Sequence, residues 1–243
     1  TAEKLKKTAD KIDEFGGTYL IKACDVTNEN DMQKVADEVY ETFGGCTYLI
    51  NGAGGNNMMA MTTNTEFDPR ELTDDKPEGA RSFFDLDIDV FDSVLKINTV
   101  GTVIACRVFG KQMIALGGGG IINFASMNTY CPLTRVPAYA MSKAAIANYT
   151  KWLAAYLAPA NVRVNAIAPG FFVNERSKNY LGTVKDGLTA RGEKVISHTP
   201  AKRFGEAKDL LGTVEWLLND EVSSFVTGIT VPVDGGFLTL SGV

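Results

Sequence analysis

The sequence predicts an α/β protein with a doubly wound parallel sheet, in which helices cover both faces to give three layers. Short apolar runs rich in β-branched residues alternate with longer segments whose apolar residues recur at helical spacing. The chain has 243 residues, of which 45% are hydrophobic and 22% charged, so it is long enough to bury a sizeable core. Because neither an internal repeat nor a linker divides it, we expect a single domain over residues 1–243.

Five apolar runs are predicted to be strands: 17–26, 47–51, 120–126, 162–170 and 228–236. Amphipathic helices are predicted between the runs, because apolar side chains recur there every three or four residues. These side chains are Met32, Val35, Val39 and Phe43, then Val94, Ile97 and Ile104, then Ile146, Tyr149, Leu153 and Leu157. Strands and helices in alternation predict βαβ units and therefore a parallel sheet.

Three segments depart from this alternation. Residues 55–88 and 172–200 are polar and longer than usual connections, so we expect a substrate-side loop and a lid. The chain opens on a charged helix, without the Gly-rich turn that holds the pyrophosphate in doubly wound dinucleotide folds. The glycine run 117–120 follows no strand and is better explained as a helix-to-strand turn. We therefore expect the first βαβ unit, about 30 residues or more, to be missing.

Charge and cysteine pattern argue against several classes of function. The 24 basic and 29 acidic residues are interspersed and leave a net charge of -5, which disfavours a nucleic-acid or anionic membrane surface. The four cysteines lack C-x-x-C spacing and there is one histidine, so we expect reduced thiols and no metal site. Neither an apolar run long enough to span a bilayer nor a signal-peptide pattern is evident. We expect a cytoplasmic protein that binds small molecules and other copies of itself.

The stretch YAMSK places Tyr139 and Lys143 four residues apart on a predicted helix, so their side chains share one face. A phenol has a pKa of about 10, whereas a general base that works at neutral pH should titrate nearer 7. An ammonium group within about 4–6 Å stabilises the phenolate and lowers that pKa. The pair alone is a weak motif, and it needs support from the residues at the strand ends.

Seven motifs follow one another at or near the predicted strand ends. They are CDVT (24–27), LINGAGG (49–55), KINTVGT (96–102), INFASM (122–127), YAMSKAAI (139–146), RVNAIAPGF (163–171) and TGITVPVDGGF (227–237). Together they resemble the short-chain dehydrogenase/reductase family over nearly the whole chain, and Ser126 precedes Tyr139 by thirteen positions, as in that family. The resemblance implies a Rossmann-like fold and an oxidoreductase that uses NAD or NADP.

The resemblance also implies roles for individual residues. Tyr139 would be the general acid/base, Lys143 its cationic partner, and Ser126 the group that hydrogen-bonds the reacting oxygen. Asn98 would hold a proton-relay water. Cofactor contacts are implied for Asp25, Val26, Asn51, Gly52, Ala53, Gly54, Tyr139, Lys143, Pro169, Gly170 and Phe172.

Structural explanations remain open for these residues. Tyr139 could be a helix residue with a solvated hydroxyl, Ser126 could cap a strand end, and Asn98 could be a buried amide that bonds a loop. Asp25 could cap the helix that begins near Asn28. The strand-end glycines could serve the packing of the sheet, the cofactor or both.

Within the family, the chain most resembles the D-mannonate oxidoreductase (fructuronate reductase) branch, through NGAGGNN (51–57), SMNTYCPLTRVPAY (126–139) and HTPAKRFGE (198–206). A sugar acid needs a cation for its carboxylate, and Arg135 is the first candidate and Arg176 the second. Asn128 is a further candidate substrate contact, and a solvated surface position is the alternative for each arginine.

Two other functions stay open at this point. One is a reductase of another keto sugar acid or polyol, of the gluconate 5-dehydrogenase type. The other is a non-catalytic oligomeric relative that lacks the phosphate loop. The resemblance also implies a homotetramer, with the helices that carry Asn98 and Tyr139 in one interface.

Overall fold

The computed structural model describes residues 2–174, 177–183 and 185–239. In this part of the chain the main sheet has four parallel strands in the order β1-β2-β3-β6, and β4 and β5 form a separate antiparallel pair. The strands are β1 (Tyr48–Asn51), β2 (Gly119–Phe124), β3 (Val162–Pro169), β4 (Gly182–Thr183), β5 (Gly187–Leu188) and β6 (Thr230–Val233). The α-helices are α1 (Ala2–Glu14), α2 (Glu29–Phe43), α3 (Ile88–Asn98), α4 (Val100–Ala115), α5 (Pro137–Leu157), α6 (Lys178–Leu181), α7 (Ala190–His198), α8 (Lys208–Leu218) and α9 (Asp220–Ser223). Short 3-10 helices are η1 (Met58–Ala60), η2 (Pro69–Leu72), η3 (Phe83–Asp85), η4 (Met127–Thr129), η5 (Ala158–Ala160) and η6 (Phe237–Thr239).

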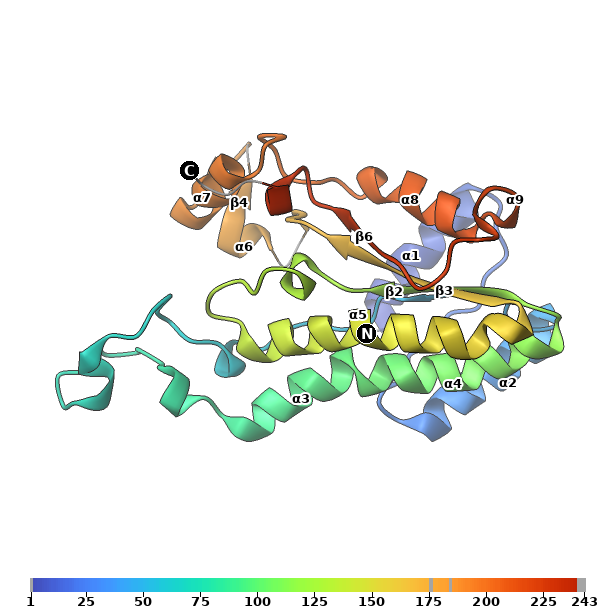
Figure 1. Ribbon diagram of the computed structural model, residues 1–243, viewed down its shortest axis with the longest axis horizontal. Coiled ribbons are helices and arrows are strands. Elements are labelled where there is room, and N and C mark those ends of the chain that lie inside the picture. The colour runs from blue at the N-terminus through green and yellow to red at the C-terminus, as the bar shows by residue number, and fades with distance from the viewer. Residues whose placement is uncertain (1, 175–176, 184, 240–243) are drawn as a thin grey trace.

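Helices cover both faces of the main sheet, as Figure 1 shows. On one face, α4 and α5 pack against β2 and β3 around a buried cluster that includes Met113, Ile121 and Val164. On the other face, Leu217 of α8 packs against Ile122. Neighbouring residues of β2 thus enter opposite layers, because successive side chains of a strand alternate. This arrangement confirms the predicted three-layer α/β fold with a parallel, Rossmann-like sheet.

The parallel register brings the carboxyl ends of the strands to one edge. Asn51 of β1 lies opposite Asn123 of β2, and Asn123 lies opposite Ala166 of β3. Open parallel sheets bind ligands at this edge. The segments after Asn51, Phe124 and Pro169 are therefore those that position the site.

The strand predicted at 17–26 is wrong. Residues 17–25 have no regular structure, and Asp25 and Val26 lead into the turn before α2. A strand forms only when a neighbour accepts and donates backbone hydrogen bonds, and within the described residues no strand pairs with this segment. The apolar pattern of 17–26 is typical of a strand, but no neighbouring strand in the described fold forms hydrogen bonds with it.

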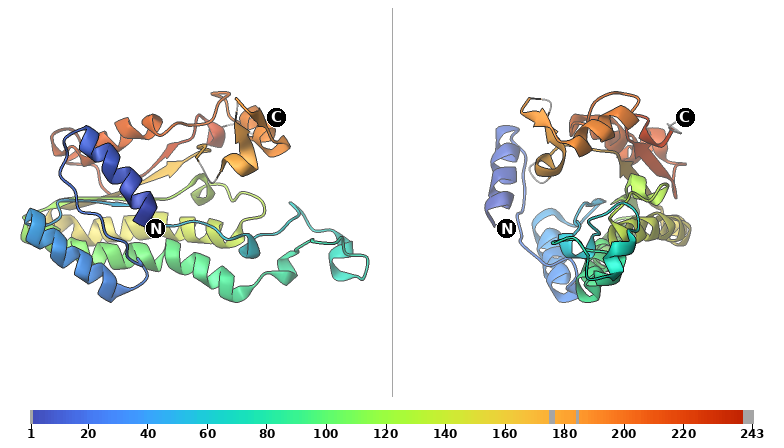
Figure 2. Two further views of the ribbon diagram at one scale, coloured as in Figure 1. Left: turned by 180° about the vertical axis from the view of Figure 1, so that it is seen from behind. Right: turned by 90° about the vertical axis from the view of Figure 1, so that its left-hand side faces the viewer.

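The two irregular segments form distinct structures. Residues 55–88 form a long arm that carries η1, η2 and η3 and extends away from the sheet (Figures 1 and 2). Arg81 fastens its two sides together, since its N–H donates to Thr63 Oγ1 over 2.9 Å and its guanidinium donates to the Met58 carbonyl over 2.6 Å. The described part of 172–200 folds into α6, β4, β5 and α7.

One helical stretch, Ile88–Ala115, spans α3 and α4 with an interruption at Thr99. By length and composition it could cross a membrane, with a mean hydropathy of 1.2. The sequence pattern does not reveal it, because scattered polar residues break its apolar runs. Since 56% of its most apolar 18-residue window is buried inside the fold, it has the character of a core helix.

Candidate active site

Tyr139 and Lys143 lie near the start of α5, whose first residue is Pro137. Proline suits this place because its fixed φ favours the helix and its missing N–H would have no helical partner. Lys143 Nζ lies 5.5 Å from the centre of the Tyr139 ring, one helical turn away on the same face. The lysine side chain is buried, and its ammonium donates to the Phe124 carbonyl at the end of β2 over 2.7 Å. The structure therefore places the predicted pair at the ligand-binding edge of the sheet.

The electrostatics of this pair differ from expectation. Burial lowers the pKa of Lys143 to about 8. Burial also raises the pKa of Tyr139 above its usual value, and a hydrogen bond with Ser126 opposes this rise only in part. The Tyr139 pKa is thus raised and not lowered as predicted, because desolvation outweighs the hydrogen bond with Ser126. At neutral pH Tyr139 is a neutral phenol, ready to donate a proton.

Ser126 follows β2 and has two contacts at once. Its Oγ caps η4 by accepting from the backbone N–H of Asn128 over 3.2 Å, and it is also hydrogen-bonded with Tyr139. The capping explanation and the proposed catalytic contact are therefore compatible. Asn128 is itself buried; its Nδ2 donates to Ser126 Oγ over 3.3 Å and its Oδ1 accepts from Leu133 N–H over 2.9 Å. Asn128 thus orients Ser126, which differs from the direct substrate contact that we expected.

Asn98, the last residue of α3, ties that helix to the loop after β1. Its Oδ1 accepts from Gly55 N–H over 3.1 Å, and its Nδ2 donates to the Gly55 carbonyl over 2.7 Å and to the Val94 carbonyl over 2.8 Å. The side chain is fully buried. This is the structural alternative considered for Asn98: a buried amide that bonds a neighbouring loop.

Gly54 lies between Asn98 and Lys143. A Cβ atom at Gly54 would lie 2.4 Å from Asn98 Oδ1 and 3.9 Å from Lys143 Nζ, and the φ angle of Gly54 is +156°. Such closeness leaves room for hydrogen alone, so glycine is required here by packing. By contrast, a Cβ at Gly52 would have no atom within 4 Å, and Gly52 and Ala53 expose their backbone.

The other predicted cofactor residues have different surroundings. Asn51 donates through Nδ2 to Asn123 Oδ1 over 2.9 Å, which joins β1 to β2 rather than pointing to a ligand. Pro169 ends β3 and Gly170 follows it, and a Cβ at Gly170 would lie 2.6 Å from the Cα of Asp234. Gly170 is thus needed for the close approach of the chain after β6.

Asp25 and Val26 lie in the turn before α2. Asp25 Oδ1 accepts from the backbone N–H of Thr27 over 2.9 Å and from Thr27 Oγ1 over 2.8 Å, and these bonds lower the pKa of the exposed carboxyl. Asn28 caps α2, so the capping role considered for Asp25 is wrong. Val26 packs against α4, where a Cβ at Gly101 would lie 2.7 Å from Val26 Cγ2.

Tyr139 lines a cavity of about 650 Å³ between the arm and the segment after β3. Gly55, Asn56, Met58 and Met61 come from the arm side, and Phe171, Asn174, Ser177, Asn179, Tyr180, Leu181 and Arg191 come from the other side. The cavity has the size of a small-molecule site. The predicted loop and lid segments thus enclose the predicted acid/base.

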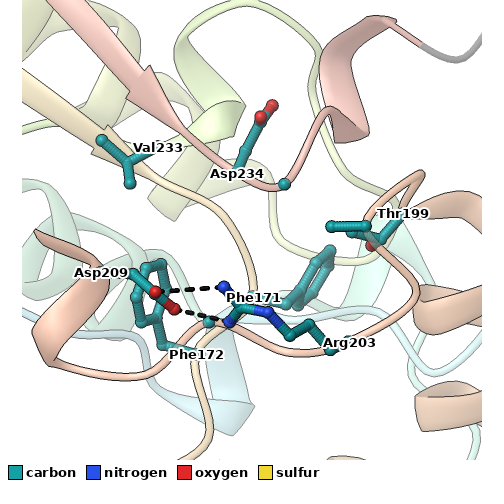
Figure 3. A pocket seen from close by; sticks show the side chains of 10 residues that line it. Phe171, Phe172, Thr199, Arg203, Asp209, Val233 and Asp234 are labelled. Carbon is teal, nitrogen blue, oxygen red and sulfur yellow. Dashed lines mark hydrogen bonds and ion pairs between the residues drawn. The ribbon is translucent and has the colours of Figure 1, made fainter.

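Phe172 lines a second and smaller cavity of about 150 Å³ and does not line the cavity of Tyr139. There Arg203 donates to Asp209 through Nη1 over 2.6 Å and through Nη2 over 3.1 Å, while the Asp234 carboxylate points away from this pair (Figure 3). The structure therefore does not bring Phe172 to the cavity of Tyr139. Phe171 lines both cavities. It therefore lies in the cavity of Tyr139, where Phe172 was expected.

Arg135 is half-buried and its backbone adopts the left-handed conformation, with φ at +73°. Its Nε donates to the Thr62 carbonyl over 2.9 Å, and its own carbonyl accepts from Thr62 N–H over 3.1 Å. These two bonds hold Arg135 against the base of the arm. Arg176, the second candidate, lies outside the described residues.

Known proteins share this fold. The sequence profile of the short-chain dehydrogenases matches residues 1–182, and the chain belongs to the short-chain dehydrogenase/reductase family. An uncharacterised oxidoreductase, UxuB, from Bacillus subtilis (strain 168) is 43% identical over 243 residues, which are 100% of this chain and 85% of the relative. An uncharacterised oxidoreductase from Haemophilus influenzae is 41% identical over 99% of this chain and 83% of the relative.

A solved structure gives the same picture. A crystal structure of a candidate D-mannonate oxidoreductase from Haemophilus influenza, with bound NAD, aligns with a TM-score of 0.89 and 40% identity. The alignment covers 98% of this chain and 83% of that one. The chain is therefore similar over almost its whole length to a protein that binds NAD.

Sequence reasoning brought together Tyr139, Lys143, Ser126 and Gly54, which lie side by side in the fold. It missed Phe171, although the PGF motif contains this residue, and it missed Arg191. Arg191 follows no motif, and only the folding of 172–200 over the sheet edge brings it to Tyr139. A sequence contains no local signal for such a contact.

Proposed function

We propose that this protein transfers a hydride between NAD or NADP and a secondary alcohol or ketone of a sugar acid, with D-mannonate and D-fructuronate as the first candidates. The observation that carries the proposal is Tyr139, hydrogen-bonded with Ser126 and one turn from Lys143, on the wall of a cavity that Arg191 also lines. The similarity to a candidate D-mannonate oxidoreductase with bound NAD supports it.

The residues present fit a nicotinamide dinucleotide. The Lys143 ammonium has three N–H donors and uses one on the Phe124 carbonyl, so it can also hold a ribose hydroxyl. Asp25 exposes a carboxylate that can accept from an amino group. The backbone of Gly52 and Ala53 lies open and can approach a flat ring closely. When bound, the cofactor supplies or accepts the hydride.

In the direction of reduction, Ser126 and Tyr139 hold the ketone oxygen, and Tyr139 donates its proton to that oxygen as the carbon receives the hydride. The raised pKa of Tyr139 suits this step, because the phenol is fully protonated at neutral pH. The phenolate that remains is stabilised by Lys143. Oxidation of the alcohol follows the same path in reverse, with Tyr139 as the base.

The test is a spectrophotometric assay of nicotinamide oxidation. We expect the full chain to oxidise NADH or NADPH in the presence of fructuronate, and the Tyr139→Phe variant to lose activity by a factor of about 10² to 10⁴. The variant keeps the ring and should fold normally, which circular dichroism checks. Absence of turnover over a panel of keto acids, or full activity of Tyr139→Phe, refutes the proposal.

A second candidate is the reduction of another keto sugar acid or a polyol. A 2-dehydro-3-deoxy-D-gluconate 5-dehydrogenase from Dickeya dadantii is 29% identical over 96% of this chain, and an NAD-dependent glycerol dehydrogenase from Listeria innocua is 31% identical over 97%. A cation in the cavity favours the acid over the uncharged polyol. The same assay with 5-ketogluconate and glycerol separates these substrates.

A further inference from the structure

Arg191 is a cation in the Tyr139 cavity that has no partner in the described part of the chain. It lies in the first turn of α7 and is half-buried. Among the described residues it makes neither a hydrogen bond nor an ion pair, although a guanidinium has five N–H donors. Burying part of an unpaired charge is unfavourable, and here a second cation adds to the penalty: burial first, and then the charge of Arg135, lower the pKa of Arg191.

The described walls around Arg191 are cationic. Arg191 lines the Tyr139 cavity and two adjoining cavities of about 400 and 390 Å³, both of which Arg135 lines as well. Arg81 and Lys194 each line one of these adjoining cavities. Among the described residues that line the three cavities there is neither Asp nor Glu. This local excess of positive charge stands out in a chain whose net charge is -5.

The two arginines differ in how firmly they are held. Arg135 is fixed at the base of the arm by two hydrogen bonds with Thr62, and its terminal Nη groups make no bond with the described residues. Arg191 stands on α7, across the cavity from the arm. An anion between them would relieve the repulsion of two like charges and satisfy guanidinium groups that are now without acceptors.

We propose that Arg191, assisted by Arg135, binds the carboxylate of the substrate and thereby selects acids over neutral polyols. This inference rests on the proposed function, since it concerns the same cavity and the same reaction. A six-carbon chain that places a hydroxyl at Tyr139 and its carboxylate at Arg191 fits a cavity of about 650 Å³. Arg191 is then a specificity residue, and Tyr139 remains the acid/base.

The test compares two substrates that differ in one group. D-mannonate and mannitol share a six-carbon polyhydroxy chain, and only mannonate has a carboxylate. For Arg191→Gln we expect kcat/KM for mannonate to fall about 100-fold, mainly through KM, because a charge-assisted bidentate contact is lost. The value for mannitol should change less than about threefold. Arg191→Lys should lie between, because it keeps the charge and loses the planar fork.

Arg107→Gln is the matched control, because it removes the same charge from an exposed arginine of α4 that pairs with Glu29. It should leave both substrates unaffected. Equal losses on mannonate and mannitol in Arg191→Gln overturn the inference, as does an unchanged KM for mannonate. A wild-type preference for a sugar phosphate over mannonate overturns it too, because the cavity would then select phosphate.

Calorimetric titration of mannonate and mannitol separates this inference from the proposed function. If the wild type binds mannonate and Arg191→Gln does not, the carboxylate site holds even where turnover is absent. If wild type and variant bind mannonate equally, or neither binds it, the inference fails whatever the assay shows.

Discussion

At the scale of single residues, Lys143 lies in the candidate site, and burial of its charge destabilises the fold. Its ammonium is buried and has one protein acceptor, the Phe124 carbonyl. The pKa of about 8 means that the folded state disfavours the charged form relative to the unfolded chain, where a lysine titrates near 10.4. Below pH 8 both states are protonated and the whole penalty is present.

We therefore predict that Lys143→Met inactivates the enzyme and stabilises the fold. The pKa depression corresponds to about 3 kcal/mol, and loss of the bond to Phe124 removes about 1, so the free energy of unfolding should rise by about 2 kcal/mol below pH 8. As pH rises from 8 towards about 10, the folded wild type releases a proton that the unfolded chain retains, so the difference should shrink. Urea unfolding at several pH values measures this, and a gap that widens with pH contradicts it.

At this scale the identities of Tyr139, Lys143 and Ser126 could be predicted from spacing and order. Their pKa values could not, because desolvation depends on residues distant in sequence, such as Phe124. Arg191 had no signal for the same reason: its role depends on which side chains face it across the cavity.

At the scale of elements, Asn98 clasps α3 to the loop that follows β1. Three hydrogen bonds of its amide hold Gly55 and Val94, and Gly54 passes within van der Waals reach of Asn98 and Lys143. The clasp places the loop directly beside the ammonium of the site. Its integrity therefore links the stability of two elements to the geometry of Lys143.

We predict that Gly54→Ala destabilises the protein by about 2 kcal/mol or more and lowers activity, because its Cβ would collide with Asn98 Oδ1 and its φ of +156° is unfavourable for alanine. Gly52→Ala, two residues earlier, is the control and should change stability by less than about 0.5 kcal/mol, since nothing lies within 4 Å of its Cβ. Guanidinium unfolding measures both. Equal stability of the two variants would contradict the close contact between Gly54 and Asn98 Oδ1.

Sequence patterns located the core helices and four strands of the main sheet at this scale, and placed a strand at 17–26 that does not form. The difference lies in pairing. Runs such as 162–170 are buried on both faces and hydrogen-bonded on both sides, whereas 17–25 lacks a paired neighbour in the described fold. Hydrophobic periodicity indicates which side chains are buried. It does not indicate which strand will pair with a given segment.

At the scale of the whole molecule, α5 exposes a row of stacked aromatic side chains. Tyr149 and Trp152 have ring centres 6.3 Å apart, and Trp152 and Tyr156 have theirs 5.2 Å apart at 9°. Trp152 is 58% exposed and Tyr156 68%. Large exposed aromatic surfaces favour association. We propose that this face of α5, together with α3, joins copies of the chain in a homotetramer.

Trp152→Glu should then shift the mass in light scattering from a tetramer to a dimer or monomer, because a charge would enter an apolar interface. The fold of each copy should persist, since the site is exposed. Phe15→Glu, at an exposed aromatic after α1 that is remote from α5 in sequence, should leave the mass unchanged. A monomeric wild type, or an unchanged Trp152→Glu variant, contradicts the assembly.

The left-handed backbone of Arg135 has an energetic cost. A non-glycine residue in this region costs about 1 kcal/mol, a cost that glycine would not bear. Selection for stability alone would thus favour glycine at this position. On the proposed carboxylate site, an arginine stands at this position because its charge is needed there, at the expense of that stability.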